Sequence, residues 1–345
     1  MKVAHFEVRP YRLGLAKPLV LRAGELRTRD GALVRVISES GAEGWGDCAP
    51  LPSFSPESLD QAMQDLNACL DSVKGAEIRS FDELAAWAQS IGGVCSSARF
   101  AAESALASAA AAEAGESLAG WLLGTHSDIC LVCALAAGPP DTWAEAAYWA
   151  SADKFRVLKI KVGRAAMRRE ISAIFEAVSA APTLRFRLDA NRAWTAETAL
   201  SFAREISTAP VDYLEEPFSG AFQPPDGWPG EIRLAQDESL WTDGDPAPPT
   251  PPVAAWILKP TLAGGLIRAV RLALRAKRAG CEAVWSSAYE SGVGIRILGE
   301  IGGALGGFAG LDTLRALQRD LLEPPLSFVD GALDLRAARR SVVDW

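Results

Sequence analysis

The sequence predicts an α/β fold in which a β/α-barrel follows a smaller α+β module. The chain has 345 residues, which suits a barrel of ~250 residues plus a second module. Between residues 128 and 313, short apolar runs alternate with longer stretches rich in Ala, Leu and Arg. Strands that alternate with helices in this way form parallel sheets. Residues 1–122 lack the alternation, so we expect them to form a separate module.

Eight apolar runs have the length and composition of β-strands. In chain order they cover residues 129–135, 157–162, 184–190, 211–215, 232–237, 254–259, 283–287 and 308–311. The stretches 164–180, 195–207 and 266–280 between them have helical character, whereas 220–230 is rich in Pro and Gly and predicts an exposed loop. Eight parallel strands can close into a barrel.

The N-terminal residues have a mixed pattern. Hydrophobic alternation over 32–37 predicts a strand, and Arg29-Asp30-Gly31 predicts a turn before it. An alanine-rich helical region follows over 56–123. The sequence after Leu322 again has strand character, and we expect it to return to this module.

Composition excludes several classes of protein. The formal charge is −8, which argues against nucleic-acid binding because that function needs a basic face. Early charges interrupt the N-terminus and no apolar run approaches ~18 residues. We therefore expect no signal peptide, no membrane span and a cytoplasmic location. The six cysteines are expected to be reduced, with Cys130 and Cys133 as plain strand residues.

Charged residues recur at the ends of five successive predicted strands, where barrels carry their functional groups. Lysines and carboxylates dominate this set, which comprises Lys159, Lys161, Arg187, Asp189, Asn191, Glu215, Asp237 and Lys259. Side chains alternate along a strand, so Lys159 and Lys161 point the same way. One such residue alone is commonly a helix cap or a solvated side chain. Their repetition along the barrel predicts a single site at its mouth.

Three carboxylates would meet in the middle of this mouth, those of Asp189, Glu215 and Asp237. Three carboxylates together need a cation. All-oxygen ligation selects a hard divalent ion, for which we predict Mg²⁺, with Mn²⁺ as a substitute.

A divalent cation that faces lysines indicates proton removal next to a carboxylate, because the cation stabilises the enediolate that forms. The predicted base is Lys161. Its neighbour Lys159 and the cation would lower its pKa from the ordinary ~10.4 of a lysine. The two histidines, His5 and His126, end no functional strand.

These residues resemble the enolase superfamily and, within it, the muconate-lactonizing subgroup, which has a Lys-x-Lys on the second strand and acids on the next three. The closer resemblance is to the o-succinylbenzoate synthase family. It rests on Leu-Asp-Ala-Asn-Arg-Ala-Trp-Thr at 188–195, Leu-Glu-Glu-Pro at 214–217, Asp-Glu-Ser-Leu at 237–240, Leu-Lys-Pro-Thr-Leu-Ala-Gly at 258–264, Arg-Thr-Arg-Asp-Gly at 27–31 and Gly-Trp-Gly-Asp-Cys-Ala-Pro at 44–50.

The resemblance implies a modified (β/α)8 barrel of the (β/α)7β type with an N-terminal α+β capping domain. The implied division is a capping domain at 1–122, a catalytic barrel at 123–320 and a C-terminal segment at 321–345 that returns to the capping domain. The implied reaction is Mg-dependent dehydration of 2-succinyl-6-hydroxy-2,4-cyclohexadiene-1-carboxylate to o-succinylbenzoate in menaquinone biosynthesis. Asp189, Glu215 and Asp237 would bind the metal.

In the implied reaction Lys161 removes the α-proton and then helps the hydroxyl leave from the same face. Lys259 would stabilise the enediolate as a cation against a π-system. Loops at 22–27 and 50–54 would close over the substrate. The expected substrate contacts are Lys159, Arg187, Asn191, Ser286 and Ser287.

Alternatives remain within and outside the superfamily. N-acylamino-acid racemases, dipeptide epimerases and muconate cycloisomerases use the same two lysines. An epimerase needs an acidic pair on the last strand, where this chain has the single acid Asp312. A non-catalytic binding protein on a retained barrel is disfavoured by the complete set of lysines and carboxylates. We expect a small-molecule carboxylate as partner, no nucleic acid, no membrane, and a monomer or homo-oligomer.

Overall fold

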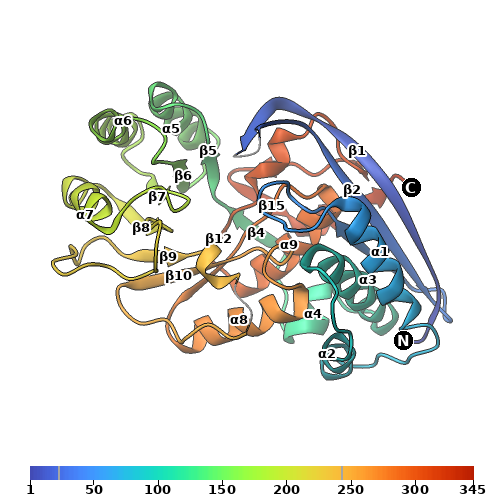
Figure 1. Cartoon of the computed structure of the whole chain (residues 1–345). Helices are drawn as coiled ribbons and strands as arrows, with labels where there is room; N and C mark the ends of the chain where they lie inside the picture. The colour runs from blue at the N-terminus through green and yellow to red at the C-terminus, as the bar shows by residue number, and fades with distance from the viewer. Residues whose placement is uncertain (22–23, 242–243) are drawn as a thin grey trace.

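A computed structural model describes residues 1–21, 24–241 and 244–345. Arg22 and Ala23, at the start of the predicted closing loop 22–27, lie outside the described residues. An N-terminal α+β unit lies beside a ring of parallel strands that helices surround (Figure 1). The predicted fold class, a barrel with an N-terminal capping unit, is therefore confirmed.

The capping unit packs helices against a three-stranded antiparallel sheet. Its elements are β1 (Val3–Leu21), β2 (Gly24–Ser38), β3 (Glu43–Cys48), α1 (Leu59–Asp71), α2 (Phe81–Ser90), α3 (Ser96–Ala114) and α4 (Leu118–Leu123). The turn predicted at 29–31 is wrong, because these residues lie within β2 and pair with residues 11–13 of β1. An ion pair between Arg12 and Asp30, with contacts of 2.7 and 2.9 Å, joins the two strands there.

Helix α3 lies close against strand β3 because two glycines leave room for its backbone. A Cβ atom at Gly44 would lie 2.0 Å from the carbonyl oxygen of Ala105, and one at Gly46 would lie 2.0 Å from that of Ala101. Both alanines are fully buried. The alanine-rich sequence is thus explained by close helix–sheet packing, for which small side chains are needed.

The barrel strands form a closed ring. Seven of them make one parallel sheet, in the order β5 (Ala134–Ala136), β6 (Val157–Lys161), β7 (Arg185–Asp189), β8 (Val211–Glu215), β9 (Leu234–Gln236), β10 (Val253–Leu258) and β11 (Glu282–Trp285). Strand β12 (Phe308–Ala309) follows β11 through a parallel bridge between Ser286 and Gly310. It then pairs in parallel with β4 (Ile129–Val132). Only Cys133 separates β4 from β5, so the ring returns to its start.

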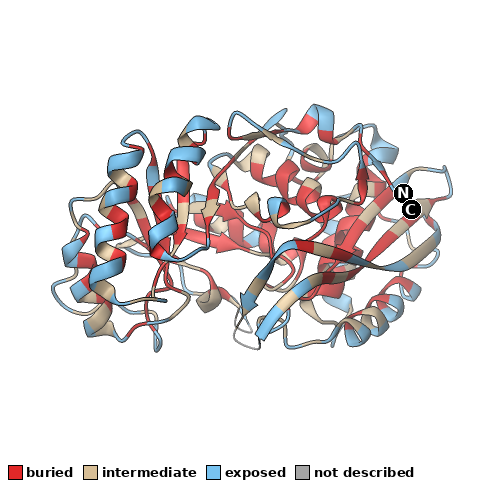
Figure 2. Ribbon diagram, turned by 90° about the horizontal axis from the view of Figure 1, so that it is seen from above, coloured by how far each residue is buried: buried red, intermediate tan, exposed pale blue. Residues whose placement is uncertain are grey.

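Helices cover the outside of this ring. They are α5 (Trp143–Ala152), α6 (Met167–Ala180), α7 (Ala196–Glu205), α8 (Leu266–Arg278) and α9 (Gly292–Leu305). Their inner sides are buried and their outer sides exposed, as Figure 2 shows for the helices at its left edge. The connection 216–233, all of which is described, contains no α-helix, in keeping with its Pro- and Gly-rich sequence.

The C-terminal residues contact both units. The hairpin of β14 (Phe328–Val329) and β15 (Ala332–Asp334) pairs antiparallel with β4 of the barrel, whereas β13 (Leu322–Glu323) pairs with β16 (Val342–Val343). The final Trp345 ring lies edge-on to Trp45 of the capping sheet, with centroids 4.9 Å apart. The tail therefore extends the barrel as well as touching the capping unit, and the predicted domain boundaries stay a prediction.

The helices in the described parts of the chain are all too short or too polar to cross a membrane.

Candidate active site

Two lysines and two carboxylates lie side by side at the ends of three neighbouring strands. The register pairs Lys161 of β6 with Asp189 of β7, and Asp189 with Glu215 of β8. The Lys159 ammonium donates to both oxygens of Glu215, at 2.7 and 2.6 Å, and lies 2.8 Å from Asp189 Oδ2. The Lys161 ammonium lies 2.6 Å from the same Asp189 oxygen. Parallel strands thus bring together residues that are far apart in the sequence.

The other half of the mouth repeats this pairing. Asp237 directly follows β9 and Lys259 directly follows β10, and the Lys259 ammonium donates to Asp237 Oδ2. The turn that carries Asp237 is held by the buried Glu216, whose Oε1 accepts from the Asp237 and Ser239 amides at 2.8 and 2.7 Å. Sequence reasoning missed this role of Glu216, although its place in the Glu-Glu-Pro motif was visible.

The three carboxylates are fully buried, and their donor chemistry fits a hard divalent cation because every potential ligand atom is oxygen. Asp237 Oδ1 is buried with no hydrogen-bond partner in the described residues. Asp189 Oδ1 accepts from the Asn191 amide at 2.9 Å, and the other oxygens are engaged by lysines. In this arrangement no three acidic, His or Cys side chains of the described residues are placed as a metal site. The residue types fit Mg²⁺ through their oxygen donors, whereas in this arrangement the lysines balance the carboxylate charge that the cation would otherwise balance.

Burial acts differently on the two β6 lysines. It disfavours the charged form of Lys159, but the carboxylates of Asp189 and Glu215 outweigh it and hold the pKa of Lys159 well above its usual range. For Lys161 burial prevails over Asp189, and the nearby charges of Lys159 and Lys259 add to it, so the pKa is lowered. A lowered pKa suits a general base.

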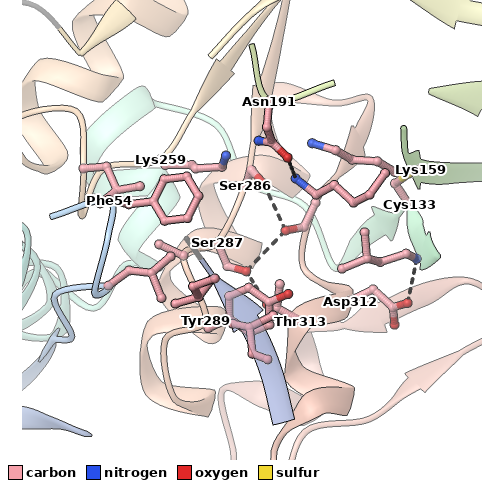
Figure 3. A pocket seen from close by; sticks show the side chains of 18 of the residues that line it. Phe54, Cys133, Lys159, Asn191, Lys259, Ser286, Ser287, Tyr289, Asp312 and Thr313 are labelled. Atoms are coloured by element: carbon pink, nitrogen blue, oxygen red, sulfur yellow. Dashed lines mark hydrogen bonds between the residues drawn. The ribbon is translucent and has the colours of Figure 1, made fainter. Parts of the chain in front are cut away.

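A cavity opens above these charged residues. Its walls include Lys159, Lys161, Lys259, Asn191, Ser286 and Ser287 of the predicted set, together with Leu19, Val20, Leu21, Leu51, Phe54, Cys133, Leu135, Arg164, Tyr289, Asp312 and Thr313. In Figure 3 Lys159, Lys259 and Asn191 lie in the upper part of the pocket, and Tyr289, Asp312 and Thr313 lie in the lower part. One end of the cavity is therefore cationic, and much of the wall is apolar.

Hydroxyl groups cluster on the wall formed by the last two strands. Ser286 Oγ donates to the Gly310 carbonyl oxygen at 3.3 Å, and Ser287 Oγ bonds to Thr313 Oγ1. On the opposite strand Asn191 accepts from Lys161 at 3.0 Å and donates to Glu238 at 3.1 Å. These contacts hold polar side chains in place along the cavity.

Comparisons with known proteins show which family the chain belongs to. Residues 141–339 match the family model described as "Enolase C-terminal domain-like", and residues 3–87 match that of the "MenC, N-terminal domain". The chain is 33% identical to the o-succinylbenzoate synthase of Pectobacterium atrosepticum, over 97% of both chains. It is 34% identical to that of Edwardsiella ictaluri, over 90% of this chain and 91% of the relative.

The chain belongs to the o-succinylbenzoate synthase family, an enzyme family of the enolase superfamily.

Solved structures support the fold. The L-Ala-D/L-Glu epimerase of Bacillus subtilis superimposes with a TM-score of 0.85 at 22% identity, covering 97% of this chain and 96% of that one. The dipeptide epimerase of Methylococcus capsulatus, complexed with Mg and L-Arg-D-Lys, has a TM-score of 0.81 at 24% identity, with 97% of both chains covered.

One predicted substrate contact lies elsewhere in this family member. Arg187 is buried inside the barrel, where its guanidinium donates to the Phe308 carbonyl oxygen and to Glu282, each at 2.8 Å, and stacks over Tyr213. It is absent from the cavity wall. Arg187 precedes Asp189 by two residues on β7, so it points inward but one layer deeper. The structure therefore gives it contacts within the barrel and none with the cavity.

The capping unit contacts the cavity wall through a buried arginine that was not among the predicted site residues. Arg29 of β2 is 1% exposed. Its guanidinium donates to the carbonyl oxygens of Ala49 and Pro50 in the capping loop, at 2.8 and 3.0 Å, and to that of Tyr289 in the barrel, at 2.9 Å. Tyr289 has a φ of 62°, which is costly for a residue with a side chain. The arginine thus ties both walls of the cavity together.

A second buried contact across the same junction comes from Asp47 of β3. Its Oδ2 accepts from the Ser291 amide and hydroxyl, at 2.8 and 2.7 Å, and its Oδ1 accepts from the Tyr11 hydroxyl at 2.8 Å. The loop 286–291 is therefore positioned by charged groups of the capping unit as well as by its own strand.

Proposed function

We propose that the chain dehydrates 2-succinyl-6-hydroxy-2,4-cyclohexadiene-1-carboxylate to o-succinylbenzoate, a step of menaquinone biosynthesis. The observation that carries the proposal is the pair of lysines, Lys161 at the end of β6 and Lys259 directly after β10, that line one cavity from opposite sides. The family relationship over nearly the whole chain adds the substrate. Named relatives are synthases of this product.

In the proposed reaction the neutral Lys161 amine takes the α-proton of the ring carboxylate. The electrons of the C–H bond move toward that carboxylate, where the Lys259 ammonium offsets the negative charge. Protonated Lys161 then gives its proton to the hydroxyl group, the C–O bond breaks and water leaves as the ring becomes aromatic. The proton balance closes because Lys161 ends as it began.

Mg²⁺, held by Asp189, Glu215 and Asp237, is the proposed cofactor and would act as a Lewis acid on the substrate carboxylate. Solved dipeptide epimerases of the same fold bind Mg. The proposal requires the lysines to loosen their contacts with these carboxylates when the cation is present, which leaves Lys161 free to act as a base.

The racemase and epimerase alternatives have less support in the cavity. Asp312, the first residue of a 3-10 turn after β12, is 3.2 Å from Arg315 and accepts from the Leu135 amide at 2.9 Å. A substrate ammonium would have to compete with both partners. We therefore keep racemisation as a side activity to be measured rather than as the main proposal.

The test is turnover of the cyclohexadiene substrate, followed by the ultraviolet absorbance of the aromatic product. We expect product formation with Mg²⁺, loss of activity after chelation, and recovery when Mg²⁺ or Mn²⁺ is restored. Failure to form product, together with no exchange of the α-proton in deuterated water, would show that the chain is not this enzyme.

A further inference from the structure

Arg164 on the cavity wall has no counterion among the described residues. The wall carries the ammonium groups of three lysines and the guanidinium of Arg164. Each lysine is paired with a carboxylate. Over residues 1–21, 24–241 and 244–345, by contrast, no hydrogen bond or ion pair to the Arg164 side chain is present. This guanidinium is therefore an uncompensated positive charge beside the proposed substrate.

The backbone that carries Arg164 is firmly held although its side chain is exposed. The amides of Gly163, Arg164 and Ala165 all donate to the carboxylate of Glu170, at 2.9, 2.8 and 2.9 Å. Glu170 is 1% exposed, so this anchor is shielded from water. A fixed backbone lowers the entropy lost when the arginine orders on a ligand.

The charge of Arg164 reaches into the lower part of the pocket. Burial raises the pKa of Tyr289, and Arg164 is the first of the nearby cations that oppose this rise. Arg164 follows Lys161 by three residues, yet its charge is felt at Tyr289, which comes from the other side of the cavity wall. Arg164 and Tyr289 both line this cavity.

The proposed substrate has two carboxylates, one on the ring and one at the end of the succinyl chain. The ring carboxylate must lie at the lysine end, where the α-proton is removed. The succinyl chain of the substrate then extends along the cavity wall. Its terminal carboxylate needs a cation that is not already neutralised. Arginine suits this role because its planar fork matches a carboxylate.

We propose that Arg164 binds the terminal carboxylate of the succinyl chain and makes the site selective for acyl chains that end in an acid. This inference rests on the proposed function. Other arginines near the cavity are already engaged, since Arg29 is bonded to backbone carbonyls and Arg315 is paired with Asp312.

The test compares two ligands that differ only in that carboxylate, o-succinylbenzoate and o-butyrylbenzoate, by titration calorimetry with Mg²⁺ present. We expect the unchanged protein to bind o-succinylbenzoate about tenfold more tightly, since a charge-assisted hydrogen bond contributes that much. In Arg164→Gln the preference should fall to about one, because the butyryl ligand never used the arginine.

Arg168→Gln is the matched control, since Arg168 is exposed on α6 in the same segment and does not line the cavity. It should keep the full preference. A preference that survives in Arg164→Gln, or that is lost equally in Arg168→Gln, would overturn the proposal.

Kinetics separates this inference from the proposed function. Arg164→Gln should raise KM for the cyclohexadiene substrate while kcat changes little, because a remote contact contributes to ground state and transition state alike. If the unchanged protein forms no product, the proposed function fails, and the ligand preference still decides whether Arg164 reads the distal carboxylate. If it forms product but shows no preference, only the Arg164 assignment fails.

Discussion

Lys161 and Lys159 lie two residues apart on β6 and point to the same face, yet their pKa values shift in opposite directions. Lys159 contacts two carboxylates, which keep it charged, whereas Lys161 contacts Asp189 and Asn191 and has a lowered pKa from burial. Two lysines on one strand can thus take different roles, one as a fixed cation and one as a base. The number of carboxylates each one meets makes the difference.

Replacing Lys161 tests this division of roles. We expect Lys161→Ala to lower kcat at least about a hundredfold, the usual scale for a lost general base, and to abolish α-proton exchange measured by NMR in deuterated water. Lys161→Arg should be equally inactive, because a guanidinium stays protonated. The control is Lys154→Ala, which removes an exposed lysine paired with Asp330. Near-normal exchange in Lys161→Ala would mean that another group is the base.

At the scale of elements, one wall of the cavity is a loop of the barrel that residues of the capping unit hold in place. The loop 286–291 follows β11 and has contacts within the barrel, and Arg29 and Asp47 of the capping sheet add further contacts to it. A barrel strand alone would leave Tyr289 in a strained conformation with few partners. The capping strands therefore shape the pocket as well as cover it.

Arg29→Met should remove the hydrogen bonds that join the capping loop at Ala49 and Pro50 to the barrel loop at Tyr289. The substitution leaves several buried carbonyls without donors, so we expect the free energy of unfolding to fall by about 3 kcal/mol and KM to rise. Denaturant titration and steady-state kinetics measure the two effects. Arg12→Met is the control, because its ion pair with Asp30 is largely exposed and should contribute little to stability. If Arg29→Met matches this control, the arginine does not fix the loop.

At the scale of the whole molecule, a buried carboxylate joins the two units. Glu103 of α3 in the capping unit is 1% exposed and accepts from the Ile267 amide, at 2.9 Å, in the first turn of barrel helix α8. Burial raises the pKa of Glu103 from 4.5 to about 7. The junction therefore holds a group that is protonated in the folded state at pH values where the unfolded chain is ionised.

This difference makes stability depend on pH with a definite sign. Between pH 4.5 and about 7 the folded state binds more protons at Glu103 than the unfolded state does, so the contribution of this group to folding falls as pH rises. Its total change is at most about 3 kcal/mol. Glu103→Gln keeps an acceptor for Ile267 but cannot ionise. We expect the unfolding free energy of this variant relative to the unchanged protein to increase across that window.

Denaturant unfolding at several pH values measures this difference. A gap between the two proteins that stays constant from pH 4.5 to 7 would contradict the shifted ionisation. If the unfolding free energy of Glu103→Gln minus that of the unchanged protein fell as pH rose, the sign would be opposite to the one expected.

Local patterns in the sequence carried the prediction of the barrel and of its charged mouth. Apolar runs repeat once per strand and helix, and parallel strands place their ends at one edge. The sequence alone therefore predicted that one site contains Lys159, Lys161, Asp189, Glu215, Asp237 and Lys259. The predicted substrate contact of Arg187 stays a prediction, because strand alternation gives the side on which a residue lies and not its depth in the barrel.

The sequence by itself determined which strands exist and which charged residues end them, since periodicity and strand order are local properties of the chain. Only the tertiary structure decided how those charges pair, that the Arg164 side chain has no partner among the described residues, and that Arg29 reaches a loop 260 residues away. The physical reason is that pairing and burial depend on distances between segments that no local pattern encodes. The closing of the strand ring and the docking of the capping sheet set those distances.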